Sequence, residues 1–212
     1  MRWLMLAVLV ASGAAQAQEA AVGQSWSVVG PKTISSGANA IEGAVGWPGL
    51  SVSYLHGLAA RFNLGARFSF NYGVEGIVRY QVTPGIKLQV LTKFSLLESG
   101  RVSLGVTFEP GPLFHFYSTS TLVGFALPVG FRLGVAASSA VQLAILFDLP
   151  FWISFGAAAS FNVPILTGVG VEFFLQSNLL LFLRLRMGPT IFARGGPAEF
   201  TLESAVGVGW RF

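Results

Sequence analysis

The chain has no cysteine, few charged residues and, beyond residue 17, no apolar run of the length that a membrane helix needs. Without cysteine it can form no disulfide, thiol nucleophile or thiolate metal site. A spanning helix needs about 20 consecutive apolar residues, and the apolar run that begins at Leu179 is interrupted by Arg184 and Arg186. Charged residues make up 10% of the chain and hydrophobic residues 53%, which is a poor composition for a soluble domain.

Side chains that commonly perform catalysis or bind metals are also scarce. The sequence has two histidines, His56 and His115, and one aspartate, Asp148. A zinc site takes about three or four protein ligands, and neither histidine has a plausible second and third ligand. The net charge of +4 is modest, and no basic run is interleaved with aromatic residues as nucleic-acid binding would favour. The sequence therefore predicts no metal, no cofactor and no nucleic-acid partner.

The first 17 residues have the pattern of a secretory signal peptide. Arg2 supplies a positive start, residues 4–10 form a short apolar core, and Ala15-Gln16-Ala17 is a small-residue cleavage site. The apolar core is far shorter than the roughly 20 residues of a spanning helix. We therefore predict that the segment is removed and that the mature chain begins at Gln18.

The last fourteen residues alternate between two kinds of side chain. Successive residues of a strand point to opposite faces, so this stretch predicts a strand with one apolar face and one small, polar or charged face. Such alternation is typical of strands in membrane barrels. The apolar face carries Phe200, Leu202, Val206, Val208, Trp210 and Phe212, and the other carries Glu199, Thr201, Glu203, Ala205, Gly207, Gly209 and Arg211.

A strand that ends the chain on Phe212, with Trp210 two residues before it, resembles the terminal strand of Gram-negative outer-membrane β-barrel proteins. The resemblance covers residues 38–212 and is supported by the signal peptide, but no motif selects a subfamily. It implies a location in the bacterial outer membrane and contact with its lipid. It also implies that the barrel assembly machinery reads Trp210 and Phe212 as an assembly signal.

Alternation also organises the rest of the chain from residue 38 onward. The preceding residues, 18–37, show little periodicity and are predicted to be a periplasmic lead-in. Within it, Trp26, Val28 and Val29 pack into the barrel mouth or form a short extra strand. The expected organisation is thus a signal peptide (1–17), a lead-in (18–37) and one transmembrane β-barrel (38–212).

The predicted fold is an all-β, antiparallel, up-and-down barrel of twelve strands. Single-chain bacterial barrels have an even number of strands. Ten is the alternative, reached if 39–56 or 74–96 is one long strand. The predicted strands span 39–47, 50–56, 61–70, 74–82, 86–96, 101–109, 113–117, 121–135, 140–149, 163–175, 179–188 and 199–212, and the aromatic stretch 150–162 is predicted to be the longest loop.

Charged residues within the predicted strands fall on the inward parity. A charge that faces lipid costs ~2–4 kcal/mol near the membrane centre, so this segregation favours a membrane barrel over a soluble sandwich. The predicted lumen charges are Arg67, Arg79, Arg132, Arg184, Arg186, Glu42, Glu75, Asp148, Glu172 and Glu203. They either form ion pairs that hold the barrel rigid or line a narrow channel in which arginines steer anions. Many other inward positions are glycine, among them Gly134, Gly170 and Gly209, and glycine leaves room in the lumen.

Catalytic arrangements known from outer-membrane barrels are not reproduced. Lipid deacylases place His and Ser two residues apart on one strand face, whereas His115 and Ser118 are three apart and point to opposite faces. Omptin-like proteases use several aspartates, and this chain has only Asp148. Phospholipases use Ser, His and Asn, and no spacing here singles out such a set.

The sequence thus predicts a monomeric outer-membrane barrel that is not an enzyme. The first hypothesis is a narrow, passive, porin-like channel for small solutes. The alternative is a non-conducting structural or surface-binding barrel, and a lipid-modifying enzyme ranks third.

Overall fold

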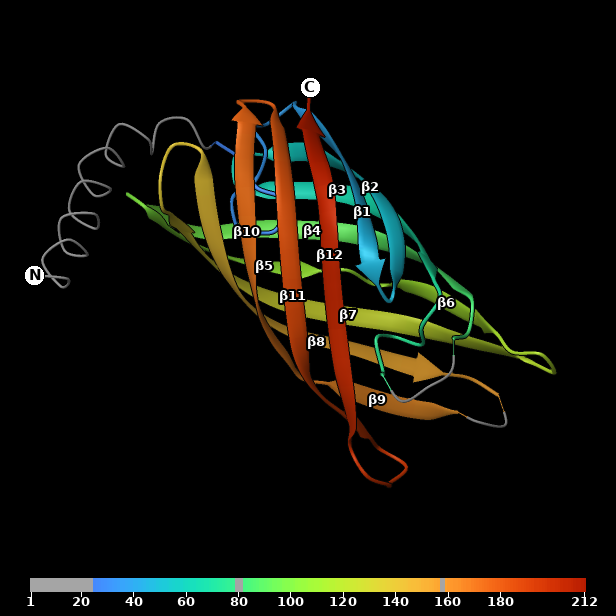
Figure 1. The fold of residues 1–212 in the computed structure, drawn as a ribbon. Coiled ribbons are helices and arrows are strands. Elements are labelled where there is room, and N and C mark those ends of the chain that lie inside the picture. The colour runs from blue at the N-terminus through green and yellow to red at the C-terminus, as the bar shows by residue number, and fades with distance from the viewer. Residues whose placement is uncertain (1–24, 79–81, 157–158) are drawn as a thin grey trace, which may run out of the picture.

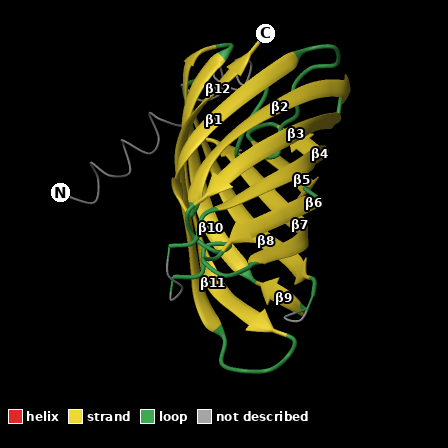
Figure 2. Cartoon of the chain, turned by 90° about the vertical axis from the view of Figure 1, so that its right-hand side faces the viewer, coloured by secondary structure: helices red, strands yellow, loops and turns green. Residues whose placement is uncertain are grey.

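The computed structural model describes residues 25–78, 82–156 and 159–212. These residues form an antiparallel sheet that curls into a barrel, so the predicted all-β barrel is confirmed (Figures 1 and 2). The strands are β1 (Asn39–Trp47), β2 (Gly49–Ala59), β3 (Phe62–Asn71), β4 (Gly85–Ser99), β5 (Val102–Phe108), β6 (Gly111–Phe116), β7 (Thr121–Ala136), β8 (Val141–Ser154), β9 (Ser160–Pro164), β10 (Leu166–Gln176), β11 (Leu179–Phe192) and β12 (Glu199–Arg211).

Ten of these strands close the ring, and the short strands β6 and β9 lie outside that closed set. The first strand, β1, pairs with both β2 and β12, which closes the sheet. β6 lies between β4 and β7, as β5 does, and the register along β7 runs on unchanged from β5 to β6. β9 continues β10 in the same way along β8 and β11. The ring therefore has ten positions, and the predicted twelve-stranded ring is wrong.

Prolines account for both interruptions, because proline has no backbone N–H to donate to a neighbouring strand. The gap between β5 and β6 contains Pro110, and Pro164 ends β9. Between these two places, Pro128 of β7 directly faces Pro150 of β8. Four neighbouring strand positions of the barrel wall thus each carry a proline at about the same height along the barrel. The strands that merge are β5 with β6 and β9 with β10, not the segments 39–56 or 74–96 considered from the sequence.

The predicted strand at 74–82 is wrong for the part that the structure describes. Glu75 and Gly76 have φ values of 46° and 75°, which lie in the left-handed region and turn an extended chain. The segment instead covers β12 beyond the end of β1, where the N–H of Val78 donates to Phe200 O at 3.1 Å and that of Leu202 to Gly76 O at 3.0 Å. The loop therefore completes the wall where β1 is too short.

The predicted long loop at 150–162 is also wrong. β8 continues through Pro150 to Ser154, and β9 begins at Ser160. β8 continues through Pro150 because its pairing with β7 does not need the missing N–H of Pro150. Antiparallel ladders alternate bonded and non-bonded pairs, and the bond from Glu109 N to Pro128 O makes the Pro128–Pro150 pair a non-bonded one. On its other side the register sets Pro150 opposite Pro164, and because neither proline has an N–H, the ladder lacks both bonds of that pair.

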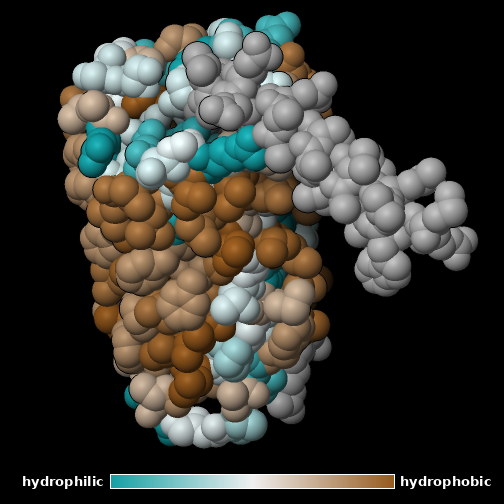
Figure 3. Space-filling model, turned by 90° about the vertical axis from the view of Figure 1, so that its left-hand side faces the viewer, coloured by the Kyte–Doolittle hydropathy of each residue, from teal (hydrophilic) through white to brown (hydrophobic). Residues whose placement is uncertain are grey.

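Apolar side chains cover the outside of the barrel, and polar ones occupy its interior. Val45, Val169 and Leu183 are 50–57% exposed on the outer face, whereas Glu42, Arg132 and other charged side chains are buried. Figure 3 shows a broad apolar surface on one side of the barrel, with hydrophilic residues gathered mainly near one end. Soluble proteins bury their apolar side chains and expose their charges, so this barrel has the reverse arrangement. Among the described residues, no helix is long and apolar enough to cross a membrane.

Residues 25–36 lie inside the barrel near the end that holds the C-terminus (Figure 1). Trp26, Val29 and Ile34 are each at most 3% exposed and pack on Leu180 and Phe182 of β11 in one apolar cluster. This part of the predicted lead-in has no strand, so we call residues 25–36 the plug segment. The predicted signal peptide and residues 18–24 lie outside the described residues.

Candidate functional site

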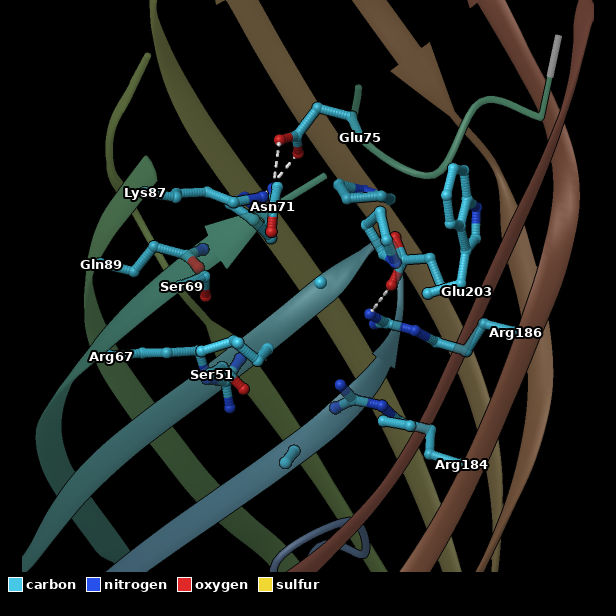
Figure 4. Close-up of a pocket in the computed structure, with 18 of the residues that line it drawn as sticks. Ser51, Arg67, Ser69, Asn71, Glu75, Lys87, Gln89, Arg184, Arg186 and Glu203 are labelled. Atoms are coloured by element: carbon cyan, nitrogen blue, oxygen red, sulfur yellow. Dashed lines mark hydrogen bonds and ion pairs between the residues drawn. The ribbon is translucent and has the colours of Figure 1, made fainter. Parts of the chain in front are cut away.

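The lumen holds a small charged cavity between the plug segment and the loop that begins at residue 72. Its volume is about 90 Å³, room for about three water molecules at about 30 Å³ each. Figure 4 shows Arg184 and Arg186 reaching across it from β11 toward Arg67 on β3. The lining side chains that carry charge are Arg67, Glu75, Lys87, Glu109, Arg184, Arg186 and Glu203.

Two groups of ion pairs fill most of the lumen around this cavity. In the first, Arg67 lies 2.7 Å from Glu109 and 3.6 Å from Glu42. Removing one partner of a buried ion pair typically costs about 3–5 kcal/mol because the other charge is left unpaired, so each member of this group depends on the others.

The second group joins four strands across the lumen. Asp148 of β8 lies 2.6 Å from Arg132 of β7 and 3.0 Å from Arg186 of β11. Arg186 also pairs with Glu203 of β12. Because the same arginine bridges two carboxylates, the wall from β7 to β12 is braced from within.

Arg184 differs from the other lumen arginines of the described chain, because no carboxylate lies within ion-pair distance of its guanidinium. Its neighbours in the cavity include two further arginines, Arg67 and Arg186, and the neutral side chain of Ser51. Arg67 and Arg186 are both paired with carboxylates. Among the described residues that line the cavity, Arg184 is therefore the cation available to a bound anion.

The plug segment is held by one buried cation and one buried anion. The Lys93 ammonium donates to the carbonyl oxygens of Ser27 at 2.8 Å, Gly30 at 3.0 Å and Val28 at 3.2 Å. The Glu172 carboxylate accepts from the Ser27 hydroxyl at 2.6 Å and from the N–H groups of Val28 and Val29 at 2.6 and 2.8 Å. Because the backbone of the plug segment satisfies both charges, its position in the barrel is well defined.

The inward glycines make room for the plug segment rather than for a pore. A Cβ atom on Gly170 would lie 2.4 Å from Val29, and one on Gly134 would lie 2.7 Å from Pro31. A Cβ on Gly209 would lie 2.6 Å from Val28. Contacts this short do not occur between real side chains, so these glycines fit the plug closely. The expectation that glycine leaves room in the lumen is confirmed at these positions, and the plug segment takes up that room.

At the other end of the cavity, Glu75 anchors its loop through buried polar contacts. Its carboxylate lies 2.5 Å from the Lys87 ammonium and 3.4 Å from the His115 ring. Burial alone would raise the pKa of Glu75, but Lys87 and His115 together lower it to about 2. The ionised carboxylate is thus the form that holds the loop.

We expect this anchor to weaken in acid. A carboxyl group whose pKa falls on folding stabilises the protein fully above its ordinary value, near 4.5, and loses that contribution as the pH falls toward 2. Thermal unfolding of the barrel and of Glu75→Gln from pH 6 to pH 2 measures this effect. The stability advantage over Glu75→Gln, on the order of 3 kcal/mol, should disappear by pH 2. Parallel stability curves for the two proteins would contradict the anchoring role.

The structure brings most of the predicted lumen charges together. Glu172 binds the plug segment, and Glu75 reaches the lumen from a loop. The predicted charges that line the lumen cavities or form the ion pairs beside them are Glu42, Arg67, Arg132, Asp148, Arg184, Arg186 and Glu203. Arg79 lies outside the described residues. Trp210 and Phe212 lie at the exposed end of β12, with ring centroids 4.9 Å apart.

Sequence reasoning missed Ser27 and the contact that Gln89 makes. The Ser27 hydroxyl donates to Glu172 at 2.6 Å, and Gln89 donates to the backbone oxygen of Glu109 at 2.8 Å. No periodic signal marks Ser27, because the plug segment is neither a strand nor a helix. Parity alone could have indicated Gln89, which is inward on β4.

No protein-family model matches this chain, and no curated protein matches it. Among solved structures, the chain is similar in fold to the outer membrane protease OmpT from Escherichia coli, at 7% identity over 82% of this chain and 96% of that one, with a TM-score of 0.48. It is also similar to the KdgM porin, in two structures at 10% and 12% identity, over 82% of this chain and 99% of that one, with a TM-score of 0.38. One of these holds disordered oligogalacturonate. At these TM-scores the likeness says nothing about what this chain does.

Proposed function

We propose that this protein is a monomeric outer-membrane β-barrel that acts as a porin-like passage for small solutes, closed by its own plug segment. The observation that carries the proposal is the reversed barrel, apolar outside and charged inside. Apolar side chains on the outer face of the strands are compatible with contact to lipid, and polar side chains in the interior are compatible with contact to water and solutes. Its proposed partners are membrane lipid, small solutes and the barrel assembly machinery, and the proposed role is not enzymatic.

The closed state follows from the size and position of the lumen cavities. The cavity near Arg184 is about 90 Å³, and the one between Lys93, Arg132 and the plug segment is about 20 Å³. The smaller cavity is lined by Val28 and Val29 of the plug segment, which occupies the lumen there. Solute can therefore pass only when the plug segment leaves its position, which requires its contacts with Lys93 and Glu172 to break.

We expect the double variant Lys93→Met with Glu172→Gln to conduct ions more often than the unaltered barrel. The change removes both charges that bind the plug backbone while keeping side chains of similar size. Refolded protein in planar bilayers under a salt gradient should show rare openings for the unaltered barrel and frequent ones for the variant. The reversal potential then reports whether anions pass preferentially.

Arg194→Gln serves as the control, since Arg194 is an exposed loop residue far from the plug in sequence. It removes a charge without touching the lumen. Folded protein that stays silent in all three forms would overturn the channel proposal.

A non-conducting structural barrel is the second candidate. It is favoured by the ion pairs that brace the lumen, in particular Arg186 between Asp148 and Glu203. In that case the plug segment is a permanent part of the core, and the double variant loses stability without gaining conductance.

A further inference from the structure

A second hollow lies on the outside of the barrel, over β1 to β4 and the junction of β5 with β6. Its volume is about 570 Å³, within the range of about 300–1,000 Å³ for small-molecule sites. Apolar side chains dominate its walls, including Val52, Phe68, Leu88 and Val90, and the residues at the junction are Pro110 and Pro112. We call this hollow the outer groove.

The wall beside the outer groove lacks two interstrand hydrogen bonds. The N–H of Val90 donates to Pro110 O at 2.8 Å, so Val90 and Pro110 form a bonded pair. Bonded pairs recur at every second residue of an antiparallel ladder, which places Leu88 opposite Pro112 in the next one. Neither proline can donate the return bond. The seam between β4 and the β5–β6 junction is therefore held more weakly than its neighbours.

Arg67 and Gln89 line both the outer groove and the charged cavity of the lumen. The two spaces thus lie on either side of the same short stretch of wall. On the lumen side, two side chains of this stretch contact Glu109. The Arg67 guanidinium lies 2.7 Å from the Glu109 carboxylate, and the Gln89 amide donates to the Glu109 backbone oxygen at 2.8 Å. The Gln89 amide thereby supplies the hydrogen bond to Glu109 O that Pro128, which faces Glu109 from β7, cannot donate.

The lumen side of this stretch offers a cation to a ligand. Arg184 lines the charged cavity together with Arg67 and has no ion pair among the described residues, while Arg67 is already paired. An arginine in this position binds a carboxylate or phosphate group readily, because its planar fork matches two oxygens. The outer groove provides the complementary apolar surface.

We propose that the outer groove binds the acyl chain of a single-chain anionic amphiphile, whose headgroup passes the proline-weakened seam to reach Arg184 in the charged cavity. The proposal rests on the membrane location proposed above, but not on solute conduction. It assigns a lateral, lipid-side entrance to the lumen, separate from the end that the plug segment closes.

Palmitate with a terminal photoreactive diazirine tests the groove. The full barrel is refolded in nanodiscs of zwitterionic phosphatidylcholine, irradiated with the probe, and the labelled peptides are identified by mass spectrometry. We expect labelling to concentrate on β2, β3, β4 and the β5–β6 junction, and to be competed by unlabelled palmitate. Labelling that is spread over the whole outer face and resists competition would show ordinary lipid contact and overturn the proposal.

Two variants test the acyl chain site. Ala66→Trp fills the groove from its floor on β3 without changing the lumen, and should abolish the concentrated labelling. Val169→Trp places the same ring on the outer face of β10, outside the groove, and should leave the labelling unchanged. Equal labelling of both variants would overturn the groove assignment even if each folds normally.

The headgroup contact is tested by competition. Arg184→Gln should raise the palmitate concentration needed for competition by about tenfold, the effect of losing one charge-assisted hydrogen bond. Arg194→Gln should have no effect. Hexadecanol, which has the same chain and no charge, should compete poorly. Equal competition by hexadecanol and palmitate would overturn the claim that the ligand's headgroup is anionic.

Groove labelling in a barrel that never conducts would contradict only the channel proposal, whereas conduction without groove labelling would contradict only the proposal of an amphiphile site.

Discussion

Replacing Leu183 by Arg is expected to prevent most of the barrel from folding into lipid. Leu183 is 50% exposed on the outer face of β11 and lies in the apolar surface that we propose to face the membrane. An arginine that faces lipid costs ~2–4 kcal/mol near the membrane centre and ~0–1 kcal/mol near its edges. The folded fraction in lipid vesicles, followed by heat-modifiable gel mobility and urea titration, measures the loss.

Two controls separate lipid exposure from general disruption. Ala205→Ser changes an inward residue that lines the charged cavity, and it should be nearly neutral. Ile191→Arg places the same charge on the outer face close to the end of β11 and should cost less than Leu183→Arg. If all three variants fold equally well in lipid, the outer face of the barrel does not contact a membrane.

Replacing Phe212 by Lys is expected to lower the amount of barrel in the outer membrane several-fold in cells. The side chain of Phe212 is 52% exposed, while its backbone N–H and oxygen both bond to Asn39 at 2.9 Å. The backbone bonds close the ring between β12 and β1 and do not depend on the side chain. The aromatic ring is therefore free to serve as the signal that the assembly machinery reads.

The same protein refolded in vitro distinguishes recognition from stability. Phe212→Lys should refold in lipid vesicles as well as the unaltered barrel, because no machinery is present there. Phe200→Lys, at the other end of β12, provides a matched exposed aromatic position and should retain most of its membrane level in cells. Normal membrane levels of Phe212→Lys would refute the signal role of Phe212.

The alternation of side chains in the sequence was sufficient to predict an all-β barrel and the face on which most strand residues lie. In a strand, the face on which a residue lies depends only on its parity, so Glu203 and Val206 are assigned to opposite sides without knowledge of any partner. The same rule placed Arg67, Asp148 and Arg186 inside. It therefore predicted that these charges would share the lumen, although not which carboxylate each arginine binds.

The tertiary structure alone decided the strand number and the closure of the lumen. A proline interrupts a ladder only when the facing residue needs its N–H, and parity does not reveal that Pro128 faces Pro150 or that Pro110 faces Val90. A glycine enlarges a lumen only when nothing fills the space above it, and Gly170 is covered by Val29 of the plug segment. The plug segment has no periodicity because Lys93 and Glu172 bind its backbone rather than a repeating set of side chains. These outcomes depend on which residues meet across the barrel, and such pairings arise only when the chain closes.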